Sequence, residues 1–174
     1  MAGKNPFKGL YCYEEDDKDI FFGRENEAAE LFSLVVLNGL TVVFGKSGIG
    51  KTSLLNAGLF PLLREEEKFL PVRMRLDYSP GGLPLLDQVK QAIQRELKKH
   101  DIVAIEKGES ELAGSFAEGE SLWEYFHRVD HINSKTFHLL RAKSQELRAD
   151  SKSPLPTVIP VLVFDQFEEL FTIG

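Results

Sequence analysis

Cysteine, tryptophan and long apolar runs are scarce in this chain of 174 residues, which has one cysteine and one tryptophan. Cys12 has no second cysteine with which to form an internal disulfide, as is usual in a reducing compartment. No apolar run approaches the roughly 20 residues that a membrane-spanning helix needs. Residues 1–10 also lack the long apolar core of a secretion signal. We therefore expect a cytoplasmic protein that makes no use of the membrane.

Positive charge is in the minority as well. Lys and Arg together number 21 against 27 Asp and Glu, for a net charge of −6. A general nucleic-acid-binding surface needs clustered Lys and Arg, so we expect no direct nucleic acid binding. The hydrophobic share of 43% is ordinary for a soluble domain, and the length suffices for one domain with a core.

What the chain does contain is a phosphate-binding loop. Gly45-x-x-x-x-Gly50-Lys51-Thr52 matches the P-loop pattern. The apolar residues 40–44 before it predict a buried strand, and residues 52–60 after it predict a helix that ends near Pro61. The glycines let backbone N–H groups turn toward anionic oxygens, and the helix N-terminus adds partial positive charge. In this geometry Lys51 reaches the β- and γ-phosphates and the Thr52 hydroxyl ligates Mg²⁺.

A second motif lies near the C-terminal end. Residues 161–164 form an apolar strand pattern that ends in Asp165. A carboxylate at the tip of such a strand beside a P-loop is a Walker B ligand for Mg²⁺, directly or through water. Glu168 and Glu169 follow, and one of them would orient or deprotonate the attacking water. Both remain candidates for the catalytic base, with Glu168 as the first choice.

A third motif precedes the P-loop. Phe21 and Phe22 are followed by Gly23 and Arg24, which open a helical stretch predicted over residues 25–38. The two rings are suited to flank a base, and Arg24 to reach the base or the phosphates.

Together these motifs resemble the novel STAND NTPases, bacterial relatives of the NACHT and apoptotic-ATPase signalling proteins. The resemblance covers about residues 5–80 and 158–172, and it is looser over residues 81–157. The stretches that carry it are Asn5-Pro-Phe-Lys-Gly-Leu10, Glu14-Glu-Asp16, Phe21-Phe-Gly-Arg-Glu25, the P-loop with Ser53-Leu-Leu-Asn-Ala-Gly-Leu-Phe-Pro-Leu-Leu63, and Phe164-Asp-Gln-Phe-Glu-Glu-Leu-Phe171.

The resemblance implies a site for ATP or ADP with Mg²⁺. It places Asp165 and Thr52 on the metal, and Glu168, Glu169 and Lys51 in catalysis. It implies nucleotide contacts from Phe22, Gly23, Arg24, Gly45, Lys46, Ser47, Gly48, Ile49, Gly50, Lys51, Thr52 and Ser53.

The resemblance also implies an ATP-dependent switch in defence or signal transduction. A sensor domain would hold the nucleotide-loaded module in check, and release would drive self-association and activate an effector. The implied fold is an α/β P-loop NTPase of the additional-strand class, three-layered (αβα), with parallel strand order 5-1-4-3-2. Strands four and five of that order have no sequence here, so we expect a domain truncated after the Walker B strand. Alone, residues 1–174 should bind nucleotide poorly, show little ATPase activity and associate.

The domain is expected in four segments. These are a linker and helix (1–39), the P-loop strand, its helix and strand two (40–80), a helical insertion (81–157) and the Walker B segment (158–174). Strand two is predicted over 69–77 and amphipathic helices over 83–99, 121–129 and 136–149, with a mobile loop within 101–119. The acid run 14–17 is predicted to be a solvated loop or a helix start. Pro160 predicts that the last strand begins at or just after it.

Other functions remain open. A small-molecule P-loop kinase would need sequence for a lid after the Walker B strand, and a non-catalytic scaffold would keep the P-loop shape without turnover. An Asn-Lys-x-Asp or Thr-Lys-x-Asp motif is absent, which disfavours a classical GTPase. His127 and His131 are spaced for one helix face, but no third metal ligand accompanies them, so both are predicted to be surface residues.

Overall fold

The computed structural model describes residues 7–9, 11–66, 68–100, 102–106, 109–112, 116–126, 138–141 and 158–171. The chain divides into two units, Met1–Glu67 and Lys68–Gly174. Unit 1 carries the P-loop and unit 2 carries the Walker B motif, and each is described by itself.

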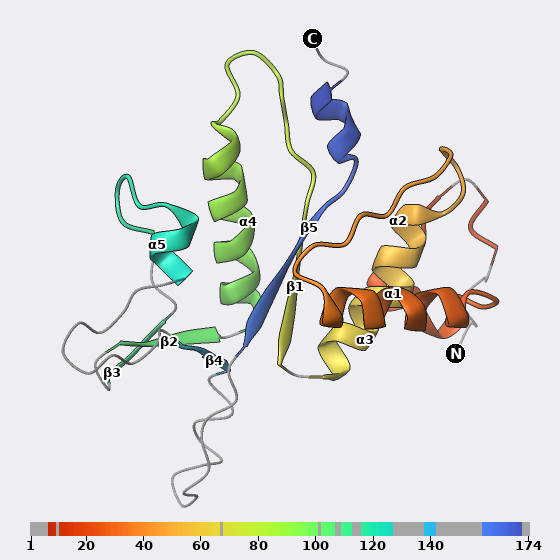
Figure 1. Ribbon diagram of the computed structural model, residues 1–174, viewed down its shortest axis with the longest axis horizontal. Coiled ribbons are helices and arrows are strands. Elements are labelled where there is room, and N and C mark those ends of the chain that lie inside the picture. The colour runs from red at the N-terminus through yellow and green to blue at the C-terminus, as the bar shows by residue number, and fades with distance from the viewer. Residues whose placement is uncertain are drawn as a thin grey trace, which may run out of the picture. The chain divides into compact units, whose positions relative to one another are not determined.

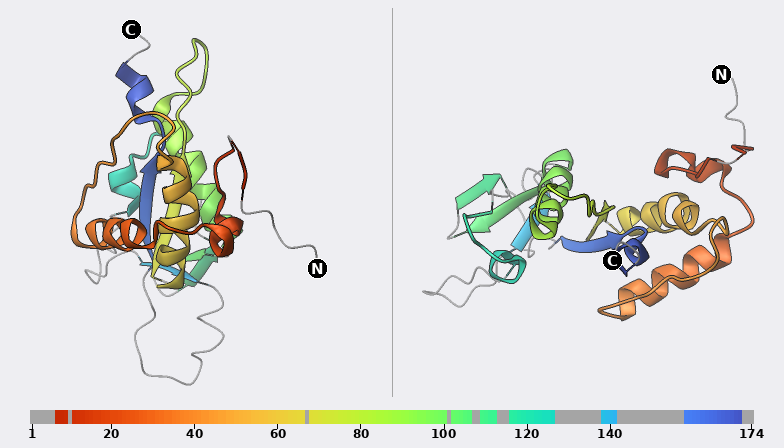
Figure 2. Two further views of the ribbon diagram at one scale, coloured as in Figure 1. Left: turned by 90° about the vertical axis from the view of Figure 1, so that its right-hand side faces the viewer. Right: turned by 90° about the horizontal axis from the view of Figure 1, so that it is seen from above.

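Unit 1 is built from helices (Figure 1). A short 3-10 helix, η1 (Glu15–Ile20), precedes α1 (Glu25–Leu37), which begins and ends close to its predicted positions. After the P-loop, α2 (Lys51–Ser53), a π-helical stretch η2 (Leu54–Leu59) and α3 (Phe60–Glu65) follow without interruption. Figure 2 shows α1 crossing this continuous helix, against which it packs.

The P-loop helix does not end near Pro61, contrary to the prediction. Pro61 lies in the first turn of α3, and the helix runs on to Glu65. The turn before the proline is π-helical, and the Phe60 N–H donates to the Leu55 carbonyl. A wider turn accommodates a residue that has no N–H, so the helix passes through the proline instead of breaking.

A glycine sets the contact between the two long helices of unit 1. A Cβ built on Gly58 would lie 3.0 Å from the Ala28 Cβ and 3.3 Å from the Leu54 Cδ1. Ala28 and Leu31 are the buried residues of α1. The absence of a side chain at Gly58 therefore permits the close approach of η2 to α1.

The prediction of a strand over residues 40–44 is wrong. These residues form no strand, and Leu40, Val42 and Phe44 are exposed, Phe44 to 89%. A β-strand is stabilised by hydrogen bonds to a neighbouring strand, and unit 1 has none among its described residues. Apolar, β-branched composition was therefore not sufficient to make a strand here.

Unit 2 centres on a pair of parallel strands. β1 (Phe69–Met74) pairs with β5 (Ile159–Phe164), in a register that runs from Phe69 opposite Ile159 to Met74 opposite Phe164. β1 is strand two of the prediction, although it ends at Met74 and not at Asp77. The strand order expected from the resemblance places strand two beside the Walker B strand, and the two are neighbours.

Helix α4 (Leu85–Lys99) packs against β1, as Figure 1 shows. The alternation in β1 directs Val72 and Met74 into the core, with Leu76 just beyond the strand. On the helix side the buried residues recur at helical spacing: Val89, Ala92, Ile93 and Leu97. This packing places Val72 and Met74 on the face toward α4 and leaves Arg73 on the opposite face, which it shares with the buried Phe69 and Pro71.

Both strands contain a proline. Pro160 is the second residue of β5, close to the predicted start of that strand, and Pro71 lies within β1. A proline cannot donate to a ladder and is confined to edge strands, strand starts or bulges. A two-stranded sheet leaves one side of each strand unpaired, which tolerates both residues.

The segment 81–157, which was expected to be a helical insertion, contains strands as well as helices. β2 (Ile102–Glu106) pairs antiparallel with β3 (Glu109–Leu112) and with β4 (His138–Arg141). β4 therefore lies where a helix was expected over 136–149, whereas β2 and β3 lie in the segment 101–119, which was expected to include a loop. The helix expected over 121–129 is found as α5 (Leu122–Phe126), and its last three residues lie outside the described ranges.

The strands were missed because each is short. Ile102–Glu106 has four apolar residues followed by a glutamate, and only two residues separate it from Glu109. Short runs of this kind are decided by pairing with a distant segment, here His138–Arg141. The architecture as a whole mixes helices with a parallel strand pair, which is compatible with the predicted α/β class.

Candidate functional site

The P-loop residues 45–50 lead directly into α2. Gly48 and Gly50 have φ angles of 80° and 87°, in the left-handed region that favours glycine. The Ile49 N–H turns back to the Lys46 carbonyl, and the Leu54 N–H closes the first helical turn onto the Gly50 carbonyl. Thr52 and Ser53 follow Lys51 in the first turn of the helix, Thr52 partly buried and Ser53 buried. The backbone therefore favours glycine at position 50, which the motif specifies, and at position 48, which the motif leaves open.

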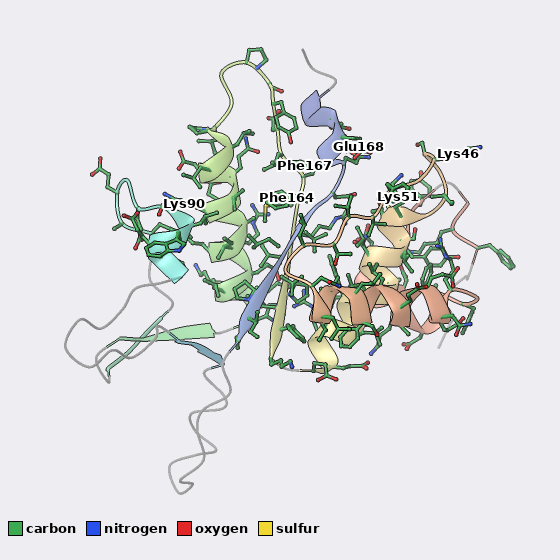
Figure 3. All side chains as sticks on the ribbon, in the orientation of Figure 1. Lys46, Lys51, Lys90, Phe164, Phe167 and Glu168 are labelled. Atoms are coloured by element: carbon green, nitrogen blue, oxygen red, sulfur yellow. The ribbon has the colours of Figure 1, made fainter. Side chains whose placement is uncertain are left out.

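Lys51 is folded over its own loop. Its Nζ donates to the Gly45 carbonyl oxygen at 2.8 Å and to the Lys46 carbonyl oxygen at 3.3 Å. Figure 3 labels Lys51 on α2 and Lys46 in the loop. Two neutral carbonyls therefore hold the ammonium over the loop, and its predicted contact with phosphates stays a prediction.

Arg24 connects the third motif to the P-loop. Its Nη1 donates to the Ile49 carbonyl oxygen at 2.9 Å, and its Nε donates to Glu27 at 3.2 Å. A Cβ at Gly50 would lie 3.3 Å from the Arg24 Nη1, so the guanidinium lies directly against the loop. The structure therefore brings Arg24 to the phosphate loop; its predicted role near the adenine stays a prediction.

The residues before Arg24 are more open. The Phe21 ring packs on Tyr13, with centroids 5.2 Å apart, whereas Phe22 is 71% exposed. Gly23 has φ 82°, and its N–H donates to the Glu25 carboxylate. That hydrogen bond lowers the pKa of Glu25 below its ordinary value. Of the aromatic pair, Phe22 therefore offers the more open ring for a base.

Sequence reasoning missed the hydrogen bonds that attach the N-terminal segment to the P-loop helix. The Tyr13 N–H donates to the Ser53 Oγ at 3.2 Å, and the Asn56 Nδ2 donates to the Tyr13 carbonyl and to Glu14. Asn56 is buried, and among the described residues its Oδ1 finds no hydrogen-bond partner. Ser53, predicted as a nucleotide contact, is thus also the attachment point of residue 13.

The acid run 14–17 is not simply solvated. Asp17 is buried, pairs with Lys8 and accepts the Glu14 N–H at 2.9 Å. Glu15 pairs with Arg64 of α3. A buried carboxylate is retained only with a cation or several donors, and Lys8 lies too far from Asp17 in the sequence for the pair to be recognised there.

In unit 2, Asp165 lies just past the end of β5. Its backbone N–H donates to the Met74 carbonyl at 2.9 Å, which ties it to the end of β1. The Arg73 Nη2 donates to its Oδ2 at 2.7 Å. The side chain of Asp165 is 10% exposed and that of Arg73 33%. The predicted metal ligand is therefore held by a guanidinium.

The two glutamates differ in their surroundings. Gln166 has φ 59°, unusual for a residue other than glycine, and turns the chain into the 3-10 helix η3 (Phe167–Phe171). On η3, Glu169 accepts the Arg75 Nη2 at 2.7 Å, whereas Glu168, labelled in Figure 3, is exposed. Burial, with the Glu169 charge nearby, raises the pKa of Tyr78.

A pocket of about 320 Å³ lies at the end of β1, between that strand and α4. Gln88 organises its wall: its Oε1 accepts the Asp77 N–H, and its Nε2 donates to the Asp77 and Leu83 carbonyls. The remaining lining residues are Met74, Arg75, Leu76, Gln91, Ala92 and Arg95.

The predicted motifs thus divide between the units, with the P-loop and Arg24 in unit 1 and Asp165, Glu168 and Glu169 in unit 2. Across the part of the chain that is described, no three His, Cys, Asp or Glu side chains gather as a metal site, and His127 and His131 lie outside that part. An Asp carboxylate and a Thr hydroxyl are hard oxygen donors of the kind that Mg²⁺ prefers. The donor chemistry at Asp165 and Thr52 therefore fits the predicted metal.

Comparison with known proteins identifies a family. The family model described as Novel STAND NTPase 1 matches residues 6–174. No curated protein and no solved structure matches the chain. Within the described residues, no helix has the length and apolar character to cross a membrane.

Proposed function

The chain belongs to the Novel STAND NTPase 1 family, and on that premise we propose that it is the ATP-binding, slowly hydrolysing part of a signalling switch. Membership identifies a nucleotide-binding signalling module. The observation that carries the proposal is the P-loop itself: left-handed glycines at 48 and 50, and Lys51 bonded across the loop.

In this proposal unit 1 holds the phosphates. The backbone N–H groups at the start of α2 and the Lys51 ammonium receive the anionic oxygens, and phosphate oxygens replace the carbonyls that Lys51 now contacts. Arg24, through the Ile49 carbonyl, keeps the end of the loop in place. Phe22 offers an exposed ring to the base.

Unit 2 supplies the acids. Asp165 and the Thr52 hydroxyl would hold Mg²⁺, which when bound neutralises charge developing on the phosphates. Glu168 orients the attacking water and accepts its proton. The Arg75 ion pair of Glu169 supports this choice, because it directs that carboxylate to the guanidinium, whereas Glu168 is exposed and accessible to water.

The wider role is part of the same proposal. In the cytoplasm, ATP binding would favour a self-associating state that drives an effector, and a sensor would hold the module in check in defence or signal transduction. Hydrolysis would then return the switch to its resting state. This account needs tight nucleotide binding and slow turnover, in contrast to a metabolic kinase.

Phosphate release by the full-length protein tests the proposal. ATP with Mg²⁺ should yield slow release of phosphate that added small hydroxyl acceptors do not change. Transfer to an acceptor would indicate a kinase. Tight ATP binding without any phosphate release would indicate a scaffold, and no binding of ATP or ADP would refute the proposal altogether.

A further inference from the structure

We propose that Arg73 is an additional residue of the metal site, a built-in cation that occupies the Asp165 carboxylate until Mg²⁺ displaces it. The inference rests on the proposed function, in which Asp165 ligates Mg²⁺. Arg73 thereby sets the Mg²⁺ concentration that nucleotide binding requires.

The register of the parallel strands builds this ion pair. Arg73 lies opposite Val163 on the neighbouring strand, and Asp165 follows Val163 by two residues. Side chains two apart along an extended chain point to the same face, so the guanidinium and the carboxylate are directed to one side of the sheet. The bond from the Asp165 N–H to the Met74 carbonyl extends the β1–β5 association to that residue.

The opposite face of β1 explains why Arg73 cannot easily turn away. Val72 and Met74, its immediate neighbours, are buried against α4. Their packing fixes the strand's orientation, and alternation then commits position 73 to the face that carries Asp165. The pairing is therefore a consequence of the core and not of two long side chains meeting at the surface.

Burial makes the pair a competitor for metal. The Asp165 side chain is only 10% exposed, so its negative charge requires a compensating cation. A guanidinium donating to Oδ2 at 2.7 Å and a Mg²⁺ ion about 2.1 Å from a carboxylate oxygen would place two cations on one small group. Their repulsion at such separation favours exchange over joint occupancy.

Arg75, the residue that follows β1, provides the comparison. It lies two residues after Arg73 and pairs with Glu169 at the same 2.7 Å. Its side chain is 60% exposed and that of Glu169 36%, so solvent screens this pair. Glu169 is also not assigned to the metal. Removing Arg75 removes the same charge from a position just beyond the end of β1 without touching the carboxylate that is to bind Mg²⁺.

The experiment measures the affinity of the full-length protein for a fluorescent ADP analogue as free Mg²⁺ is varied. Arg73→Gln should lower the Mg²⁺ concentration that gives half of the gain in affinity by about fivefold. Arg73→Lys, which keeps the charge but loses the planar fork, should give a smaller decrease. Arg75→Gln should leave the value unchanged.

A second readout needs no nucleotide turnover. In EDTA the melting midpoint of Arg73→Gln should lie below that of the parent, because Asp165 has lost its cation. Added Mg²⁺ and ADP should raise the midpoint of the variant more than that of the parent. Arg73→Lys, the milder change, provides the same comparison if Arg73→Gln does not fold.

The outcomes separate the inference from the function on which it rests. If Asp165→Asn abolishes the Mg²⁺ effect while Arg73→Gln and Arg73→Lys leave the Mg²⁺ requirement unchanged or higher, the exchange is wrong and Arg73 only orients the carboxylate. If the parent shows no Mg²⁺-dependent nucleotide binding, or Asp165→Asn equals the parent, the proposed metal ligand itself is wrong.

Discussion

At the scale of single residues, the P-loop of unit 1 and the Asp165 carboxylate of unit 2 are each held by a charged side chain of this same chain. The Lys51 ammonium donates to a carbonyl of its own loop, and the Arg73 guanidinium donates to the Asp165 carboxylate. Nucleotide and Mg²⁺ would each replace an internal contact. Residue substitutions at these positions therefore test exchange of partners and not simple addition of a ligand.

Lys51→Ala should weaken binding of ATP with Mg²⁺ by roughly 1.5–3 kcal/mol, because a charge-assisted phosphate contact is lost. Lys46→Ala is the matched control: it removes the same charge from the same loop but leaves the backbone carbonyl that Lys51 contacts. Calorimetry should show a much smaller change for Lys46→Ala. Equal losses would mean that only the net charge of the loop matters.

Glu168→Gln should slow ATP hydrolysis by about 10²–10⁴ and leave ATP bound, since a general base contributes about that much. Glu169→Gln should be milder, because Glu169 is engaged by Arg75. Single-turnover phosphate release, measured together with nucleotide affinity, separates an effect on ATP hydrolysis from an effect on nucleotide binding. If the larger loss falls on Glu169→Gln, the assignment of the base is reversed, and parental rates in both variants exclude both residues.

At the scale of elements, unit 1 depends on close approach between η2 and α1, and unit 2 on α4 covering β1. The π-helical stretch carries the P-loop helix through Pro61 and brings Gly58 against Ala28. The helix that starts at the P-loop is thus supported by α1, mainly at η2 and to a smaller extent at α3. Packing at this contact bears on the loop geometry.

Gly58→Ala should lower the melting midpoint of the protein. The new methyl would lie 3.0 Å from the Ala28 Cβ, and overpacking of about 1–3 kcal/mol outweighs the gain in helix propensity of about 1 kcal/mol. Gly39→Ala is a suitable control, because a Cβ there meets no atom within 4 Å.

Ala28→Gly should relieve the clash, so the double variant should be more stable than the sum of the two single changes implies. A double-mutant cycle read by urea unfolding measures this coupling. Strict additivity would show that the two helices adjust without contact at these positions.

At the scale of the whole molecule, the proposed site requires both units to serve one nucleotide. Lys51 belongs to unit 1 and Asp165 to unit 2. When two residues act on a shared ligand, the affinity lost in the double variant is smaller than the sum of the losses in the two single variants. When they belong to independent sites, the two losses add. Energetic coupling between these two positions is therefore a property that only the assembled protein can show.

Lys51→Ala and Asp165→Asn should be non-additive in the affinity of the full-length protein for ATP with Mg²⁺. We expect a coupling of about 0.5–3 kcal/mol, the range for residues that share a network. Calorimetric titration of the parent, both single variants and the double variant measures it. Additive losses would indicate two separate sites and contradict the single-site proposal.

Local pattern was enough for the features that repeat with a short period. The P-loop, α1, α4 and the alternation of Val72, Arg73 and Met74 follow from spacing, because neighbouring residues alone decide which side of a helix or strand is apolar. The Walker B strand is found over residues 159–164, next to strand two. Family membership was also predicted, since each motif that carries the resemblance is a continuous run of residues.

Contacts between distant segments decided the rest. Residues 40–44 have strand composition but find no partner strand among the described residues, whereas His138–Arg141 becomes a strand because Ile102–Glu106 pairs with it. The carboxylates of Asp17 and Asp165 acquire cations from Lys8 and Arg73, 9 and 92 residues away. The sequence by itself determined the chemistry of each motif. Only the tertiary structure decided which strands exist and which charge holds each acid, because hydrogen bonds between strands and ion pairs across a core depend on neighbours in space that local pattern does not encode.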